Sequence, residues 1–281
     1  MKKAEKALKS LIFILVLALL AIVLSQSRLL KKDRLAEVEI IQPSPAIPTH
    51  TAAPFPEPSI KPASAVPVGE PEVTYHLDGF TADDIYGYFA EVVLSSEYSD
   101  GTGDTSVVQK WQHPITYSID GTPTEEDRLL IEKFTAELSA VYGFPGMWEV
   151  DRSIALVQIT FCPLEELNER MGEAVNGESA DGADQSWYDN TTNEIIREEI
   201  CIRSDVSQEV RNSVILEEIV NGLGLGNDTD SRHDSVIYSG VSYPQELSDI
   251  DRLIIELLYN PAIRCGMSGE ECRAVIEWMY R

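Results

Sequence analysis

The chain has 281 residues, with 47 acidic and 22 basic side chains, a formal net charge of −25, and 43% hydrophobic residues. The length fits one or two domains, and the hydrophobic fraction excludes disorder throughout the chain. The charge argues against a nucleic-acid binder, because phosphate backbones attract basic surfaces and repel carboxylates. Residues 1–72 carry a net charge of +2 and residues 73–281 a net charge of −27. The acidity therefore belongs to the part expected to fold.

The N-terminus has the pattern of an export segment. Four lysines precede fourteen consecutive apolar residues, 11–24, and a basic region before a short apolar run is typical of such segments. Small residues at 25–27 offer a cleavage site, whereas the basic cluster at residues 28–34 resembles a membrane flank. We predict a single-pass signal-anchor within residues 1–35 that contacts the membrane through residues 11–24, with the C-terminal domain extracytoplasmic. Secretion after signal cleavage is the alternative.

A proline-rich stretch follows the apolar segment. Residues 42–71 contain nine prolines, a composition that buries no core and prefers extended polyproline geometry. We predict a disordered linker over residues 36–73 and a single globular domain over residues 74–281.

Residues 74–281 contain five predicted helices and three predicted strands. The helix starts are marked by capping residues at Thr81, Thr124, 205–208, Ser248 and Ser268. β-Branched and aromatic runs predict strands at 115–119, 155–161 and 195–202. The stretch 172–192, rich in Gly, Asp, Asn and Ser, predicts a mobile surface loop. This order indicates an α+β or α/β fold with a modest mixed sheet.

All four cysteines lie in the part predicted to be exported, where disulfides persist. Four cysteines allow three connectivities, and the sequence does not choose among them. Cys265 and Cys272 enclose a short glycine-containing loop, and Cys162 and Cys201 both lie near predicted strand ends. The absence of a CxxC pair argues against a metal site built from cysteines. We therefore treat Cys162, Cys201, Cys265 and Cys272 as disulfide candidates.

The segment 216–228, LEEIVNGLGLGND, is similar in spacing to the metzincin zinc-peptidase motif HExxHxxGxxH. Glu217, Asn221 and Asn227 fall on the three zinc-binding histidines of that motif. Glu218 falls on its catalytic glutamate and Gly224 on its glycine. The resemblance implies a mixed twisted sheet with an active-site-type helix and a C-terminal helix, preceded here by the membrane segment and the proline-rich linker.

The surrounding sequence extends this resemblance over about residues 111–260. Ser235-Val-Ile237 occupies the place of the family's methionine-containing turn, and residues 247–259 resemble its final helix. The chain looks more closely like a bacterial family of exported proteins with an uncharacterised domain. Members of that family have a helix with a Glu-Glu pair, followed by short sequence motifs. The matching motifs in this chain are Asn227-Asp228, Tyr259-Asn-Pro261 and Gly266-Met267.

The residue types at the ligand positions argue against zinc chemistry. Zinc hydrolysis needs three good ligands and one open position. Glu217, Asn221 and Asn227 supply one carboxylate and two amides, and amides are poor zinc ligands. Only Glu218 is the same residue type as at the matching position of the metzincin motif, the catalytic glutamate. A general base needs a metal-activated water from which to take a proton, and these ligand positions do not provide one. We interpret Glu217, Asn221 and Asn227 as vestigial ligand positions in a degenerate site and expect no cofactor. Glu218 is the catalytic residue only if the protein is an enzyme.

Other interpretations of these acidic residues remain open or fail. Oxygen-rich calcium or manganese binding would use Glu217, Glu218, Asp228, Asp230 and Asp234, but this spacing lacks the glycine and distal glutamate of an EF-hand. An acid/base pair of Glu217 and Glu218 fails, because adjacent helical residues point about 100° apart. His233 is interpreted as a loop histidine in a local charge pair.

Among the aromatic residues, Trp111 and Trp148 flank predicted strands and are expected in the core, whereas Trp187 and Tyr188 in the predicted loop are candidates for partner contact. The sequence thus predicts a non-catalytic module that binds an unknown protein, peptide or cell-wall ligand on a degenerate metzincin scaffold. The alternative is a metal-dependent hydrolase with Glu/Asn ligands.

Overall fold

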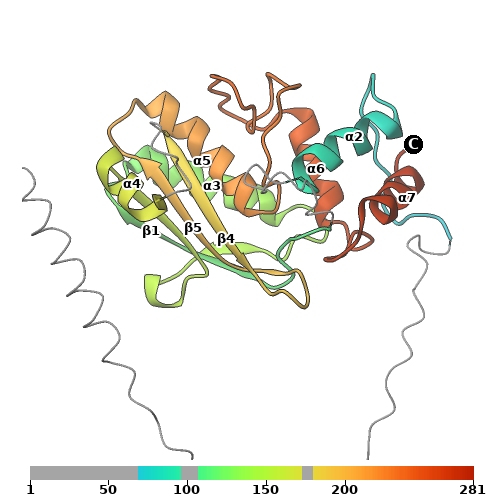
Figure 1. The fold of residues 1–281 in the computed structure, drawn as a ribbon, viewed down its shortest axis with the longest axis horizontal. Coiled ribbons are helices and arrows are strands. Elements are labelled where there is room, and N and C mark those ends of the chain that lie inside the picture. Colours follow the sequence, from blue (N-terminus) through green and yellow to red (C-terminus); the bar gives the residue numbers. More distant parts are fainter. Residues whose placement is uncertain (1–68, 96–106, 173–179) are drawn as a thin grey trace, which may run out of the picture. The chain divides into compact units, whose positions relative to one another are not determined.

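The computed structural model describes residues 69–95, 107–172 and 180–281 (Figure 1). The predicted membrane segment at residues 11–24, its cleavage site and the linker up to residue 68 lie outside the described residues. Every described residue belongs to one unit of the chain, 60–281. Within the described ranges, no helix combines the length and apolar character needed to cross a membrane.

A five-stranded mixed sheet forms one half of the described domain. Its strands are β1 (Ile115–Gly121), β2 (Met147–Glu149), β3 (Val157–Cys162), β4 (Gly182–Tyr188) and β5 (Ile195–Arg203), in the spatial order β2-β1-β3-β5-β4. All neighbouring strands are parallel except β4, which runs antiparallel to β5 at the edge of the sheet. The three predicted strands are confirmed as β1, β3 and β5.

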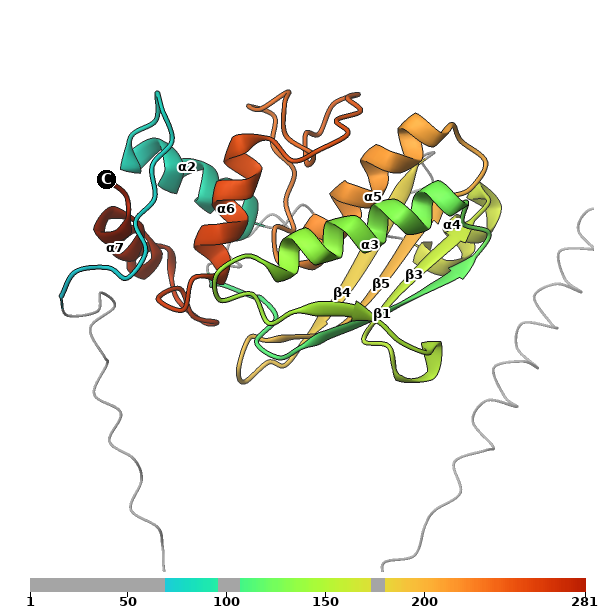
Figure 2. The same cartoon turned by 180° about the vertical axis from the view of Figure 1, so that it is seen from behind.

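Two long helices cover one face of this sheet. They are α3 (Glu125–Ser139) and α5 (Gln208–Gly222) (Figure 2). Alternate residues of β5 point toward them, because Ile200 and Ile202 are fully buried together with Ile219 of α5. A short helix, α4 (Leu164–Met171), packs on the opposite face near the ends of β3 and β5. The mixed sheet with helices on both faces confirms the predicted α+β class.

Three further helices lie beside one end of the sheet (Figure 1): α2 (Ala82–Val93), α6 (Asp249–Tyr259) and α7 (Gly269–Met279). Buried Lys110, which precedes β1, joins this group to the sheet. Its Nζ donates to Leu258 O and Ile263 O, both at 2.6 Å. Burial lowers the pKa of Lys110 to about 8, and the ammonium donates to one carbonyl in α6 and one in the turn that follows it.

The predicted helix starts are confirmed by their capping geometry. In four helices the hydroxyl of the N-cap residue accepts a hydrogen bond from the backbone amide three residues later. The side chain of that later residue accepts a hydrogen bond from the N-cap backbone amide, so two otherwise unpaired amides are satisfied. These capping boxes join Thr81 to Asp84, Thr124 to Asp127, Ser248 to Asp251 and Ser268 to Glu271. The fifth predicted helix, α5, begins after the N-cap Ser207.

Two expectations were wrong. The stretch 172–192 is not a loop throughout, because residues 182–188 form β4, held by the ladder to β5; residues 173–179 lie outside the described part. Trp148 is not a core residue. It lies on β2 with 47% of its surface exposed, whereas Trp111 is buried as predicted. Successive side chains of a strand point to opposite faces, so Trp148 points away from the face of buried Met147 and toward the sheet face that α3 and α5 do not cover.

Candidate functional site

The motif segment occupies the end of α5 and the turn that follows it. Strand β5 leads into this helix, as the resemblance implies, and α5 packs on β5 and the edge strand β4. Gly224 has a φ of +109°, and a Cβ there would lie 2.2 Å from Gln109 O. Only glycine therefore allows the chain to leave α5 against the segment before β1. The predicted tight helix exit is confirmed at this position.

A buried carboxyl group lies beneath α5 on strand β5. Glu198 is fully buried, and it is paired in register with Ser186 of β4, whose hydroxyl donates to Glu198 Oε2. Asp184, two residues along β4 on the same face, is hydrogen-bonded to Glu198. Burial, and then the charge of Asp184, raises the pKa of Glu198 well above its usual value. The raised pKa favours the protonated form of Glu198, beside Asp184, whose own pKa is also raised by burial.

Glu218 belongs to the same acidic group. Its surface is 6% exposed, and its pKa is raised well above the usual value, first by burial and then by the charges of Glu217, Asp184, Asp228 and Glu198. A Cβ at Gly182 of β4 would lie 2.4 Å from Glu218 Oε1. The missing side chain at position 182 is thus what lets α5 press its carboxyl group against the edge strand.

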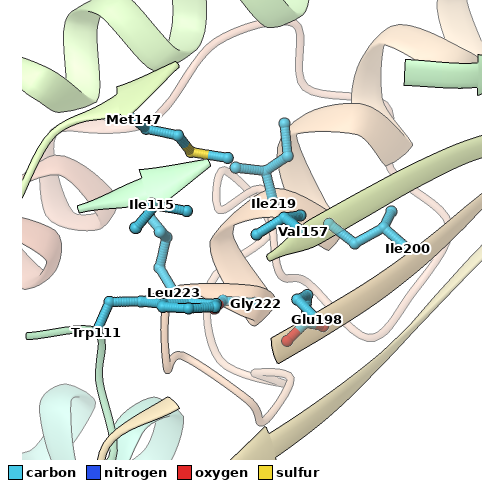
Figure 3. A pocket seen from close by; sticks show the side chains of 9 residues that line it. All are labelled: Trp111, Ile115, Met147, Val157, Glu198, Ile200, Ile219, Gly222 and Leu223. Atoms are coloured by element: carbon cyan, nitrogen blue, oxygen red, sulfur yellow. The ribbon is translucent and has the colours of Figure 1, made fainter. Parts of the chain in front are cut away.

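A small cavity extends from Glu198 between the sheet and the helices (Figure 3). Its volume is about 10 Å³, close to the minimum for one water molecule. Every other side chain on its wall is apolar, as in Ile115, Val157 and Leu223. Trp111 closes one side, and its indole Nε1 donates to Gly222 O at 2.8 Å. The cavity is too small to hold a substrate.

The vestigial ligand positions have separate surroundings. The Asn227 amide donates to Glu91 O at 3.0 Å and to Asp228 O at 2.8 Å. It therefore holds the turn after α5 to the end of α2. Asn221 Oδ1 is buried and has no hydrogen-bond partner. Glu217 is half-buried beside Glu218.

The remaining acidic candidates and His233 lie in the loop after α5. The hydroxyl of Ser239 donates to Asp230 Oδ1, and Arg232 forms an ion pair with Asp234 at 3.1 Å. The ring of His233 contacts that of Tyr238 at a tilt of 58°, with 4.4 Å between centroids, and this ring contact is found in place of the predicted charge pair with neighbouring acids. Of the proposed oxygen-rich set, only Glu217 and Asp228 lie near Glu218.

These donors do not fit the zinc of the metzincin motif. The ligand positions hold no imidazole, and the Asn227 amide nitrogen is directed to backbone carbonyls. Within residues 69–95, 107–172 and 180–281, no three His, Cys, Asp or Glu side chains are grouped closely enough to hold a metal ion. The structure accordingly supplies no set of residues through which a metal-dependent step can be derived.

The four cysteines are free thiols in the structure. Cys162 and Cys201 are buried in adjacent strands and are close enough to share a hydrogen bond. Cys265 donates to Lys110 O at 3.4 Å, and Cys272 is buried in the main core. The predicted disulfides themselves stay predictions.

The aromatic pair Trp187-Tyr188 ends the edge strand. Tyr188 is 44% exposed, and the guanidinium of Arg197 lies 4.6 Å from the Trp187 ring centroid. These residues are therefore held on a strand rather than displayed on a loop, and contact with a partner stays a prediction.

Asp184, Ser186 and Glu198 were missed as site residues by the sequence analysis. Glu198 carried a usable signal, because it shares the parity of Ile200 and Ile202 within a predicted strand. A carboxyl at a core-facing position of a strand indicates a buried, partnered acid. Asp184 and Ser186 gave no such signal, because the stretch around them has the composition of a loop.

The fold and the site together define an α+β domain whose helix-covered sheet face contains a buried acidic cluster. A family model described as "Protein of unknown function (DUF2927)" matches residues 82–278. Because this match covers most of the chain, the chain belongs to that family. The predicted uncharacterised-domain family is confirmed to this extent. No curated protein matches the sequence.

Proposed function

We propose that this is a membrane-anchored extracytoplasmic protein whose domain, residues 74–281, is a non-catalytic binding module on a degenerate metzincin scaffold. Residues 1–35 would anchor it, or be removed as a signal, and residues 36–73 would form the linker. Support for the scaffold comes from the strand leading into α5 and from the tight exit at Gly224. Helix α6, at the place of the metzincins' final helix, also begins at the predicted capping residue.

The residues at the catalytic positions support a non-catalytic role. Glu218 is only 6% exposed and lies beside four other acids, so little of its carboxyl group is open to a substrate or a water molecule. The Asn227 amide, at a ligand position, donates to two backbone carbonyls and stabilises the turn. The surroundings of Glu218 and Asn227 therefore fit a structural role and do not provide the arrangement that hydrolysis needs.

The single observation that carries the binding role is the outer edge of β4, which pairs with no other strand among the described residues. Arg203 N donates to Asp181 O at 2.9 Å, which makes residues 181 and 203 a hydrogen-bonded pair. In an antiparallel ladder such pairs alternate along the strand, so the backbone amides and carbonyls of Gly182, Asp184 and Ser186 point outward. An exposed edge of this kind binds an extended peptide as an additional strand.

The charge beside this edge indicates what kind of peptide fits. Half-buried Glu217 and Asp228 lie beside Glu218, which packs against Gly182 of β4. The positive charge of lysine or arginine side chains would complement this acidic wall. The ligand we propose is therefore an extended basic segment of a peptide or protein.

The proposal is tested with the full-length chain in mild detergent and a fluorescent peptide of alternating Lys and Val residues. We expect binding by fluorescence anisotropy that weakens with salt. Binding should fall at least tenfold when the amides along one edge of the peptide are N-methylated. A matched Glu-Val peptide is the charge control, and Ser186→Pro, which removes an outward amide, is the protein control.

Equal affinity for the Glu-Val peptide, or insensitivity to N-methylation, would contradict strand addition at β4. The hydrolase alternative is tested on the same samples by mass spectrometry of the peptide with and without added Zn²⁺. Cleavage that disappears in Glu218→Gln would overturn the non-catalytic role.

A further inference from the structure

Cys162 and Cys201 form a pair under α4. Cys162 ends β3, and Cys201 lies near the end of the neighbouring parallel strand β5, on the same sheet face. In the register of the two strands Thr160 is opposite Cys201 and Cys162 is opposite Arg203, so the cysteines are diagonal neighbours. Their exposed fractions are 1% and 3%, and their thiols are close enough to share a hydrogen bond.

The surroundings separate this pair from the other two cysteines. Leu167 and Met171 of α4 pack over Cys162 and Cys201 in a small cluster distinct from the main core. On the other side of the domain, Cys265 donates to Lys110 O, and Cys272 belongs to the main core. Each of these two thiols therefore has its own environment.

We propose that Cys162 and Cys201 are the pair that oxidises to a disulfide, while Cys265 and Cys272 remain thiols. The two thiols lose two protons and two electrons as the new S–S bond forms. An oxidising disulfide, such as that of a thiol oxidoreductase or of oxidised glutathione, is cleaved and takes up those protons and electrons to become two thiols. The inference does not depend on the peptide-binding role.

Burial determines when this bond forms. The low polarity under α4 raises the pKa of Cys201 to about 12 and also raises that of Cys162. Since the thiolate is the attacking species, the folded dithiol reacts slowly. The bond therefore forms during folding, before α4 covers the pair.

The bond would close a loop from Cys162 to Cys201 that contains α4 and the edge strand β4. Closing a loop of about 40 residues restricts the unfolded chain and raises the melting temperature by roughly 10 °C in a domain of this size. The edge strand proposed to bind peptide would thus lie inside a covalently closed segment.

The test begins with the full-length chain, reduced and unfolded in detergent and then refolded with glutathione and oxidised glutathione. After thiols are blocked, proteolytic fragments are identified by mass spectrometry with and without a reductant. We expect one linked fragment pair that joins Cys162 to Cys201, and alkylated Cys265 and Cys272. Folded, reduced protein given the same oxidant should react at least tenfold more slowly.

Two double variants make the test independent of packing effects. Cys265→Ser with Cys272→Ser should keep the linked fragment and the drop in melting temperature of roughly 10 °C on reduction. Cys162→Ser with Cys201→Ser should melt at the same temperature with and without reductant. A link between Cys265 and Cys272, any link that crosses the two pairs, or four alkylated cysteines after oxidative refolding would overturn the proposal.

Discussion

Glu198→Gln should stabilise the protein at neutral pH. Glu198 is fully buried, Ser186 donates to its Oε2, and its Oε1 accepts no hydrogen bond. A glutamine of the same shape would keep the acceptor for Ser186. Its side chain would carry no charge beside Asp184. The substitution therefore removes the ionisable group while it leaves the packing against Gly222 intact.

The magnitude follows from proton linkage. The pKa of Glu198 is raised in the folded state, so its contribution to stability is fully present below the unfolded value of 4.5 and is lost as the pH rises toward the folded value. Each pH unit in that window costs about 1.4 kcal/mol, which limits the loss at pH 7 to about 3 kcal/mol. We expect Glu198→Gln to raise the free energy of unfolding by about 1–3 kcal/mol at pH 7 and to have little effect near pH 4.5.

The assay is urea unfolding of the full-length chain in detergent, followed by tryptophan fluorescence at both pH values. Glu199→Gln is the matched control, because Glu199 lies on the opposite sheet face in an ion pair with Arg197 and is partly exposed. That change should alter stability by less than about 1 kcal/mol. A Glu198→Gln variant that is less stable than wild type at pH 7, or whose stability falls equally with pH, would contradict the raised pKa of Glu198.

Two further substitutions test the packing that positions the site, again by urea unfolding. Gly224→Ala should cost about 2–3 kcal/mol because of its positive φ and the nearby backbone oxygen, whereas Gly226→Ala, which points into open space, should stay within about 1 kcal/mol. Asp127→Ala should cost about 3–5 kcal/mol, because it leaves Arg211 buried without its partner 3.1 Å away. Asp83→Ala, which breaks an exposed ion pair, should cost no more than about 1 kcal/mol, and equal losses at Asp83 and Asp127 would contradict the burial argument.

Helix starts and inner strands were predictable from sequence because their causes are local. A capping box such as Thr124 with Asp127 satisfies its own orphan amides, whatever the rest of the chain does. Strands β1, β3 and β5 contain β-branched residues on their buried faces. Two strands and one α-helix were missed for physical reasons. Strand β2 has three residues, α4 follows Pro163 without a side-chain cap, and β4 is held as a strand by its ladder to β5.

The candidate site was predictable only in part. Spacing alone located Glu217, Glu218, Asn221 and Asn227 on or after one helix, and the structure places them there. The approach of Asp184 to Glu218 was not predictable, because Asp184 lies on β4, whose composition resembles a loop. The exposure of Trp148 followed from its alternation with Met147 on a short edge strand that the sequence did not reveal.

The pairing of the two ends of the described domain has a mechanical consequence. Tyr75 N donates to Met279 O at 3.0 Å, and Arg281 N donates to Tyr75 O at 2.9 Å, in a parallel bridge between Tyr75 and Tyr280. Just before this bridge, Trp278 donates to Gly69 O. A force that pulls the chain toward its N-terminus would shear these hydrogen bonds, so several of them must break at the same time. Tension arriving from the preceding residues would therefore be borne first by the C-terminal helix, while the sheet and its acidic cluster stay unstrained.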